Sequence, residues 1–113
     1  MRLVKLNSTD FQILLALAGE SRHGYGIMQE IARQSGGAVR MGPGSLYGAI
    51  KRLLDAGLVV EGSPPKSTEG DPRRTSYYKI TLAGRKAASE AARELADLVS
   101  VAVSHGLLPA TAR

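Results

Sequence analysis

The spacing of apolar residues changes twice along this chain, and those two changes limit its fold more than any other feature. Apolar side chains recur at helical intervals as far as Gly57, cluster or alternate as in β-strands from Leu58 to Leu82, and then return to helical intervals. The pattern predicts three helices, two strands and one further helix, in that order. A length of 113 residues fits a single small domain.

The first two predicted helices have clear ends. NSTDFQILLALAG ends at Gly19 and is apolar on two sides, so that one side could meet a second subunit. The candidates for its N-cap are Asn7, Ser8 and Thr9. A polar turn through His23 leads to the second helix, GYGIMQEIARQSGG, which stops at Gly36 and Gly37. We expect His23 to orient that turn.

The third predicted helix has one apolar and one polar face. It begins in GPGSLYGAI, where Pro43 fits the first helical position after Gly42, and it ends at Gly57. Gly44 and Ser45 are expected to supply the turn and the cap. The residues expected to face the core are Leu46, Ala49, Ile50, Leu53 and Leu54. The opposite face carries Ser45, Tyr47, Gly48, Lys51, Arg52 and Asp55.

The next segment predicts a β-hairpin. LVVEG is short and β-branched, and TSYYKITL alternates between two kinds of side chain. The long polar loop SPPKSTEGDPRR separates them and forms a projecting tip. The basic residues in or beside this tip are Lys66, Arg73 and Arg74.

The last predicted helix runs from about Leu82 to His105, with Thr81 as its N-cap. It carries a continuous seam of small and apolar residues that a domain of this size has no obvious place to bury, so we expect a partner helix from a second copy. Residues 107–113 are expected to form a flexible tail. The residues expected at the dimer interface are Phe11, Leu14, Ala88, Ala91, Leu95, Leu98, Val99 and Ala102.

The net charge of the chain and its distribution indicate what kind of molecule it could bind. The chain has a net charge of +5, and this whole excess lies between Arg40 and Lys86, where nine Lys and Arg residues face only four Asp and Glu residues. A basic segment on a recognisable scaffold favours a polyanionic partner, although the same charges could serve solubility alone.

Several other functions are not expected. The chain has no cysteine, and its two histidines, His23 and His105, lie far apart in the sequence, which argues against a metal site. The run G-x-G-x-x-x-G is one residue longer than the dinucleotide fingerprint, no G-K-[ST] follows it, and no nucleophile and base pair stands out. We therefore expect neither enzymatic activity nor a cofactor. Because no signal segment or bilayer-length apolar run is present, no membrane partner and a cytoplasmic location are expected.

The order of elements is that of a winged helix-turn-helix followed by a dimerisation helix. RHGYGIMQEI, GPGSLYGAIKRLLDAGLV and RRTSYYKITLAGRK resemble the signature stretches of the PadR family of bacterial transcriptional regulators, in its short form with one C-terminal helix. The expected fold class is mainly α with a small β-hairpin. The expected domains are a winged helix-turn-helix DNA-binding domain at 1–82, a dimerisation helix at 83–106 and a tail at 107–113. The resemblance implies a homodimeric repressor that binds a palindromic operator in double-stranded DNA and is released by a small-molecule inducer.

Position by position, the resemblance and the chemistry of the side chains place DNA contacts on two helices and on the wing. The residues are Tyr25, Gly44, Ser45, Tyr47, Gly48, Lys51, Arg52, Arg73 and Arg74. Packing is the alternative role for Tyr25 and Tyr47, and solubility is the alternative for Lys51 and Arg52. The alternative function is a winged-helix module that contacts proteins without binding DNA. Drug-binding members of the family stack ligands on aromatic residues, and this chain departs from them because it has no Trp and only Phe11 as a Phe.

Overall fold

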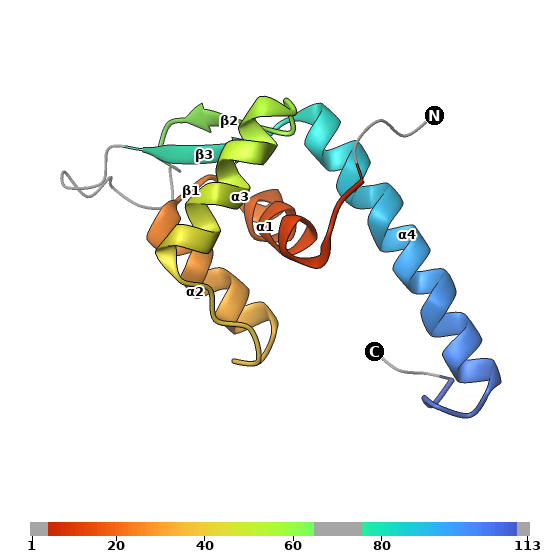
Figure 1. Cartoon of the computed structure of the whole chain (residues 1–113). Coiled ribbons are helices and arrows are strands. Elements are labelled where there is room, and N and C mark those ends of the chain that lie inside the picture. The colour runs from red at the N-terminus through yellow and green to blue at the C-terminus, as the bar shows by residue number, and fades with distance from the viewer. Residues whose placement is uncertain (1–4, 65–75, 111–113) are drawn as a thin grey trace.

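The computed structural model describes residues 5–64 and 76–110 of the chain. Its elements are α1 (Ser8–Gly19), β1 (Arg22–His23), α2 (Gly24–Gln34), α3 (Pro43–Asp55), β2 (Val59–Gly62), β3 (Tyr77–Ile80) and α4 (Leu82–Ser104). In Figure 1, α1, α2, α3 and the sheet form a body from which α4 runs outward. The predicted fold class, mainly α with a small β element in winged-helix order, is confirmed.

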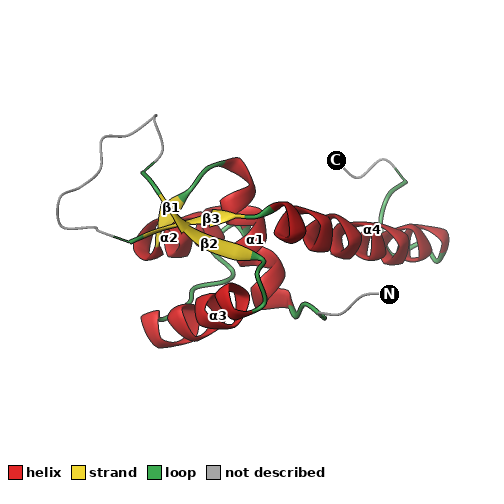
Figure 2. Ribbon diagram, turned by 90° about the horizontal axis from the view of Figure 1, so that it is seen from above, coloured by secondary structure: helices red, strands yellow, loops and turns green. Residues whose placement is uncertain are grey.

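The sheet has three strands, not the two that the sequence predicts. β3 is central, with β1 and β2 antiparallel at its two edges (Figure 2). β1 pairs Arg22 with Tyr78 and His23 with Tyr77. A two-residue polar strand carries no pattern of its own, because pairing with β3 is what makes it extended.

His23 connects this sheet to α2. Its Nδ1 atom accepts a hydrogen bond from the Gly26 N–H at 2.9 Å, so the imidazole is the N-cap of α2. The ring lies edge-on to Tyr77, with the ring centroids 5.3 Å apart. The expectation that His23 orients the turn is confirmed.

The ends of α3 agree with the sequence in two respects and depart from it in one. Pro43 is the first helical residue after the N-cap Gly42, as predicted. Ser45 is the third helical residue and not a cap, because Gly42 already takes the extended conformation that precedes the helix. At the other end Gly57 has a φ of 76°. The Leu58 N–H donates to the Leu53 carbonyl at 3.0 Å and closes a Schellman turn.

The core fills the space between α1, α2, α3 and the sheet. Its largest fully buried side chains are Ile13, Leu14, Leu17, Ile27, Ile31, Leu46, Ile50, Leu53 and Val59. Leu14, which the sequence predicts at the dimer interface, is 0 % exposed in this single chain and packs in its core. Phe11, from the same predicted interface, is half-buried.

The start of α4 is fastened to the turn that follows α3. The Thr81 hydroxyl donates to the Gly57 carbonyl at 2.8 Å and accepts from the Gly84 N–H at 2.9 Å. A β-carbon on Gly84 would lie 2.1 Å from the Leu58 carbonyl oxygen. The two backbones can approach this closely only because residue 84 is a glycine.

The Arg85 guanidinium donates to the Ala18 carbonyl at 3.0 Å, and Ala87 and Ala88 pack against the core; beyond them α4 runs out from the body (Figure 1). Of its 23 residues only Gly84 is buried. The radius of gyration is 15.3 Å, against about 13 Å for a compact domain of this size. Of the predicted tail, residues 107–110 are described and exposed, and the rest lies outside the described residues. Within residues 5–64 and 76–110, no helix has both the length and the apolar character needed to cross a membrane.

Candidate nucleic-acid interface

The outward face of α3 carries the residues that the sequence singles out for DNA contact. Gly44, Gly48 and Lys51 lie opposite the buried stripe of the helix, because successive residues turn by about 100°. Ser45 and Tyr47 lie on its two flanks, and all five are exposed. The structure therefore gathers these predicted residues on one accessible surface.

The beginning of α3 adds a positive end to that surface. The N-cap Gly42 has no side chain, and Pro43 has no N–H group. Within the described residues no side chain caps this helix, so the Gly44 and Ser45 N–H groups point outward at the positive end of the helix dipole. An anion such as a phosphate oxygen is the natural acceptor for these groups.

Lys51 and Arg52 are adjacent in sequence but differ in their surroundings. Lys51 pairs with Asp55 one turn along α3 at 3.2 Å, and the two side chains are 77 % and 69 % exposed. Such an exposed pair contributes little and exchanges readily with another anion. Lys51 is therefore available to a phosphate.

Arg52 is held by α1. Its guanidinium lies 2.6 Å from a carboxylate oxygen of Asp10, whose side chain is only 8 % exposed. Asp10 also forms a reciprocal capping box with Asn7 at the start of α1. The ion pair thus fixes α3 to the N-terminus of α1, over a sequence distance of 42 residues.

Tyr47 rests on α2. A β-carbon on Gly24 would lie 2.0 Å from the Tyr47 hydroxyl oxygen, so the ring occupies the space that any side chain at position 24 would need. The ring is nevertheless 46 % exposed. Burial raises the pKa of the neighbouring Tyr78 hydroxyl, Tyr47 and Glu61 raise it further, and a hydrogen bond with Ser76 lowers it in part. Tyr47 therefore combines a packed position with an accessible surface.

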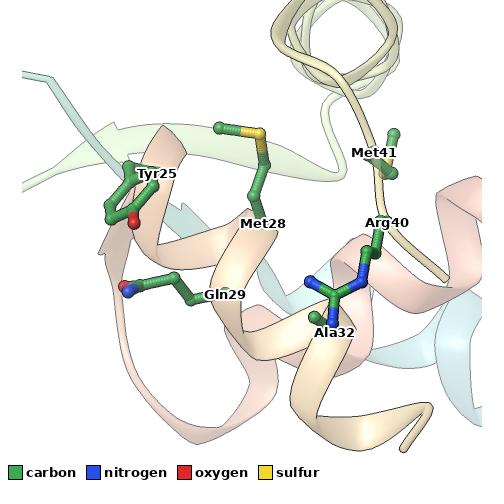
Figure 3. Close-up of a pocket in the computed structure, with 6 residues that line it drawn as sticks. All are labelled: Tyr25, Met28, Gln29, Ala32, Arg40 and Met41. Atoms are coloured by element: carbon green, nitrogen blue, oxygen red, sulfur yellow. The ribbon is translucent and has the colours of Figure 1, made fainter. Parts of the chain in front are cut away.

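Tyr25 lies on the first turn of α2 and borders a hollow. The ring is 46 % exposed. Figure 3 shows it beside Gln29, with Met28 and Ala32 further along the same helix and Arg40 and Met41 on the link to α3. Arg73 and Arg74, predicted for the wing, lie outside the described residues.

The predicted dimerisation residues of α4 form a strip along one side of the helix. Ala88, Ala91 and Ala102 are half-buried. Leu95, Leu98 and Val99 are 47 %, 66 % and 44 % exposed. The strip is thus an apolar surface on a helix that projects from the body.

Sequence reasoning missed two residues that shape the interface, Asp10 and Gly24, and a third, Gly84, that lets the start of α4 approach Leu58. A glycine at the first turn of a predicted helix, as Gly24 and Gly84 both are, is a weak signal that another group packs closely there. Asp10 gives no such signal, because acidic residues are common in the first turn of any helix.

The comparison with protein-family models shows the family of this chain. The family model described as "Transcriptional regulator PadR-like family" matches residues 13–90, and members of that family are transcriptional regulators, not enzymes. The chain is 35 % identical over 98 residues to "Transcriptional regulator Rv3488" of Mycobacterium tuberculosis, covering 87 % of this chain and 85 % of that protein. It is 37 % identical over 95 residues to an uncharacterized 37.1 kDa protein in transposon TN4556 of Streptomyces fradiae. That match covers 84 % of this chain but only 25 % of the transposon protein.

Among the solved structures that share the fold are two regulators whose names include PadR. One is a PadR family transcription regulator from Clostridium difficile, with a TM-score of 0.70 and 21 % identity, covering 88 % of this chain and 98 % of that one. The other is Bacillus subtilis PadR in complex with operator DNA, with a TM-score of 0.59 and 19 % identity, covering 74 % and 46 %. At these identities the similarity shows the fold alone.

Proposed function

The chain belongs to the PadR-like family of transcriptional regulators, and from that premise we propose that it is a homodimeric repressor that binds a palindromic operator in double-stranded DNA and is released by a small ligand. DNA binding is assigned to residues 1–82 and dimerisation to residues 83–106. Action on DNA places the protein in the cytoplasm. The solved Bacillus subtilis relative with operator DNA supports this assignment by its fold.

The observation that carries the proposal is the outward face of α3. A surface that enters the major groove must be accessible, must allow close approach and must offer donors to phosphates and base edges. Gly44 and Gly48 remove side chains from the centre of the face, and Lys51 supplies charge beside them. The free N–H groups at the start of the helix supply further donors.

We assign different roles to the two neighbouring cations. Lys51 is the phosphate contact, because its only described partner is an exposed carboxylate on its own helix. Arg52 is a positioning residue, because its ion pair with Asp10 sets the angle of α3 against α1. Tyr47, held on Gly24, contacts the sugar-phosphate backbone with its exposed edge.

Dimerisation is assigned to the apolar strip of α4. Leu95, Leu98 and Val99 are exposed on the part of α4 that projects from the body. If two copies paired through this strip, each would bury the strip of the other. The two α3 helices would then be related by a two-fold axis and could read two half-sites about one turn of DNA apart. A palindromic operator follows from this symmetry.

The test is the affinity of the protein for DNA that flanks its own gene, measured by fluorescence anisotropy over a range of salt concentrations. A dimer that neutralises about six to eight phosphates has a log-log salt slope of roughly −5 to −7. Lys51→Ala removes one contact per subunit and is expected to reduce that slope by about two. Gly48→Ala is expected to weaken specific binding because the new methyl group stands where the helix approaches the groove.

The control for Lys51→Ala is Arg52→Ala, which removes a positive charge from the neighbouring position. It is expected to lower the melting temperature, whereas Lys51→Ala leaves it unchanged. A Lys51→Ala protein with the original affinity and salt slope would refute the α3 assignment. An absence of binding to any DNA at low salt would favour the alternative, a winged-helix module that contacts proteins only.

A further inference from the structure

The hollow in Figure 3 is a second feature of the helix-turn-helix region that DNA binding does not explain. One wall is a face of α2 formed by Tyr25, Met28, Gln29 and Ala32, and the other is the link residues Arg40 and Met41. Its volume is about 410 Å³, within the range of small-molecule sites. Four residues at positions i, i+3, i+4 and i+7 span two turns of α2, a length of about 10 Å.

The link that forms the second wall is fixed in place. The Ser35 hydroxyl accepts from the Val39 N–H at 2.9 Å, and the Ser35 carbonyl accepts from the Ala38 N–H at 3.2 Å. Met28 and Met41 pack against the hydrophobic core as well as lining the hollow. The hollow is therefore formed before any ligand arrives, which lowers the entropic cost of binding.

The polarity of the lining residues changes along the length of the hollow. Three of the lining side chains, Met28, Ala32 and Met41, are apolar and half-buried, and we call them the floor of the hollow. Arg40 is the one charged residue among the described lining residues, and its guanidinium points from the link toward Ala32 at one end of the hollow (Figure 3). In the described part of the chain no acidic side chain pairs with Arg40. The other end is bordered by Tyr25 and Gln29.

This arrangement selects an elongated ligand with one negative end. A phosphate group alone would use Arg40 but would leave the methionine floor uncovered, and a neutral apolar molecule would leave the guanidinium without an anion. We propose that the hollow binds an unbranched medium-chain carboxylate. The carboxylate pairs with Arg40, and the alkyl chain lies along α2 over Ala32 and Met28 toward Tyr25. Flexible methionine side chains adapt well to such a chain.

A ligand in this hollow would affect DNA binding, because the hollow lies beside the start of α3. Arg40 and Met41 immediately precede Gly42 and Pro43, where α3 begins. A ligand that neutralises Arg40 and holds the link against α2 removes a cation beside the DNA surface and occupies space next to the helix start. The expected result is weaker operator binding. This regulatory consequence rests on the proposed function, whereas ligand binding itself does not.

The site is tested without DNA by labelling methionine methyl groups with carbon-13. The chain has three methionines, and two of them line the hollow. Octanoate is expected to shift the Met28 and Met41 methyl signals saturably, with a dissociation constant on the order of 1 mM or tighter. Acetate, which has no chain, and octanol, which has no charge, are each expected to bind at least about tenfold more weakly. Equal binding of octanol, or no saturable shift with octanoate, overturns the proposal.

Two variants and one control place the ligand in the hollow. Arg40→Gln is expected to weaken octanoate binding at least about tenfold. Ala32→Leu fills the floor with another good helix former and is expected to abolish binding without loss of helicity. Arg33→Gln removes the same charge from α2 outside the hollow and is expected to keep the octanoate affinity within about twofold. An unchanged affinity in Arg40→Gln or Ala32→Leu overturns the site.

DNA affinity with and without octanoate separates the site from its consequence. A fall in operator affinity that Arg40→Gln abolishes supports regulation through this hollow. An unchanged affinity at saturating octanoate overturns the regulatory consequence. A protein that binds no DNA at all overturns the proposed function and this consequence together, while the methyl titration still decides whether the hollow is a ligand site.

Discussion

Helices α1 and α4 both carry apolar side chains along their length, but the chain uses them in opposite ways. In α1, five of 12 residues are buried, among them Ile13, Leu14 and Leu17. In α4, one of 23 residues is buried, and that residue is a glycine. The apolar side chains of α1 are largely buried in the core of the chain, whereas most of the apolar surface of α4 remains exposed.

If α4 is the dimerisation helix, as proposed above, folding and association are assigned to separate regions of the chain. A fully buried Leu or Ile contributes about 1.5–3 kcal/mol to folding, so α1 supplies much of the stability of the body. Leu95, Leu98 and Val99 contribute little of this kind while exposed, and they become useful only when a second surface covers them. Changes in the body should therefore alter unfolding, and changes in the outer half of α4 should alter assembly.

The largest effect is expected where the two regions join. Gly84→Ala would place a β-carbon 2.1 Å from the Leu58 carbonyl oxygen, a backbone atom that cannot move aside as a flexible side chain could. We expect a loss of at least about 3 kcal/mol in the free energy of unfolding, seen as a fall of more than about 10 °C in melting temperature. Thermal denaturation followed by circular dichroism measures it.

Gly48→Ala is the matched control for that substitution. Gly48 is also a helical glycine, but a β-carbon there meets nothing within 4 Å. Alanine should stabilise the chain by about 0.5–1 kcal/mol because it is the better helix former. If both alanines had the same effect on unfolding, the close contact at Gly84 would not be what fastens α4 to the body.

The next largest effect is expected on assembly. Leu98→Glu puts a charge into the α4 strip, and it should raise the dissociation constant of the dimer on the order of 100-fold or more without lowering the helicity of the monomer. Sedimentation equilibrium measures the constant. Ser100→Glu adds the same charge about 160° around the helix from Leu98 and should leave it unchanged. A dimer that survives Leu98→Glu would mean that another surface holds the two copies together.

The fold could be predicted almost completely because hydrophobic spacing and helix caps are local signals. Thr81, Pro43 and Gly57 each mark a helix boundary within the segment that they delimit. The predicted core face of α3 is likewise buried, apart from Leu54, which is half-buried. Periodicity shows which side of a helix is apolar, but it does not show which element covers that side. For this reason the pattern of α1 alone does not show that Leu14 lies in the chain's own core.

For the candidate site, the sequence predicts which residues of α3 share an exposed face, but not which contacts each of them makes in the folded chain. Ser45, Tyr47, Gly48 and Lys51 share the exposed face that their helical spacing requires. The pairing of Arg52 with Asp10 joins residues 42 apart, and the strand β1 exists only through β3. Neither contact has a local pattern, so both emerge only when the chain is folded.

A smaller effect is expected from the ion pair within the body. Asp10→Asn removes the charge that holds Arg52 and weakens the capping box of α1, and it should cost about 1–2 kcal/mol in urea denaturation. Asp55→Asn breaks the exposed pair with Lys51 and should cost no more than about 0.5 kcal/mol. Neither change should alter the dimer constant, since both residues lie in the body. Equal costs would contradict the assignment of Arg52 as a positioning residue.

The smallest effect is expected at alkaline pH, where only the body should respond. Because burial raises the pKa of Tyr78 above its ordinary value of 10.0, the unfolded chain loses this proton before the folded chain does. Stability from this group is complete below pH 10 and falls above it, by at most about 1.4 kcal/mol per pH unit until the folded hydroxyl ionises. Tyr78→Phe should remove this part of the slope in urea denaturation between pH 9 and 11. If the free energy of unfolding of Tyr78→Phe fell with pH as steeply as that of the original protein, ionisation of Tyr78 would not be what destabilises the body at high pH.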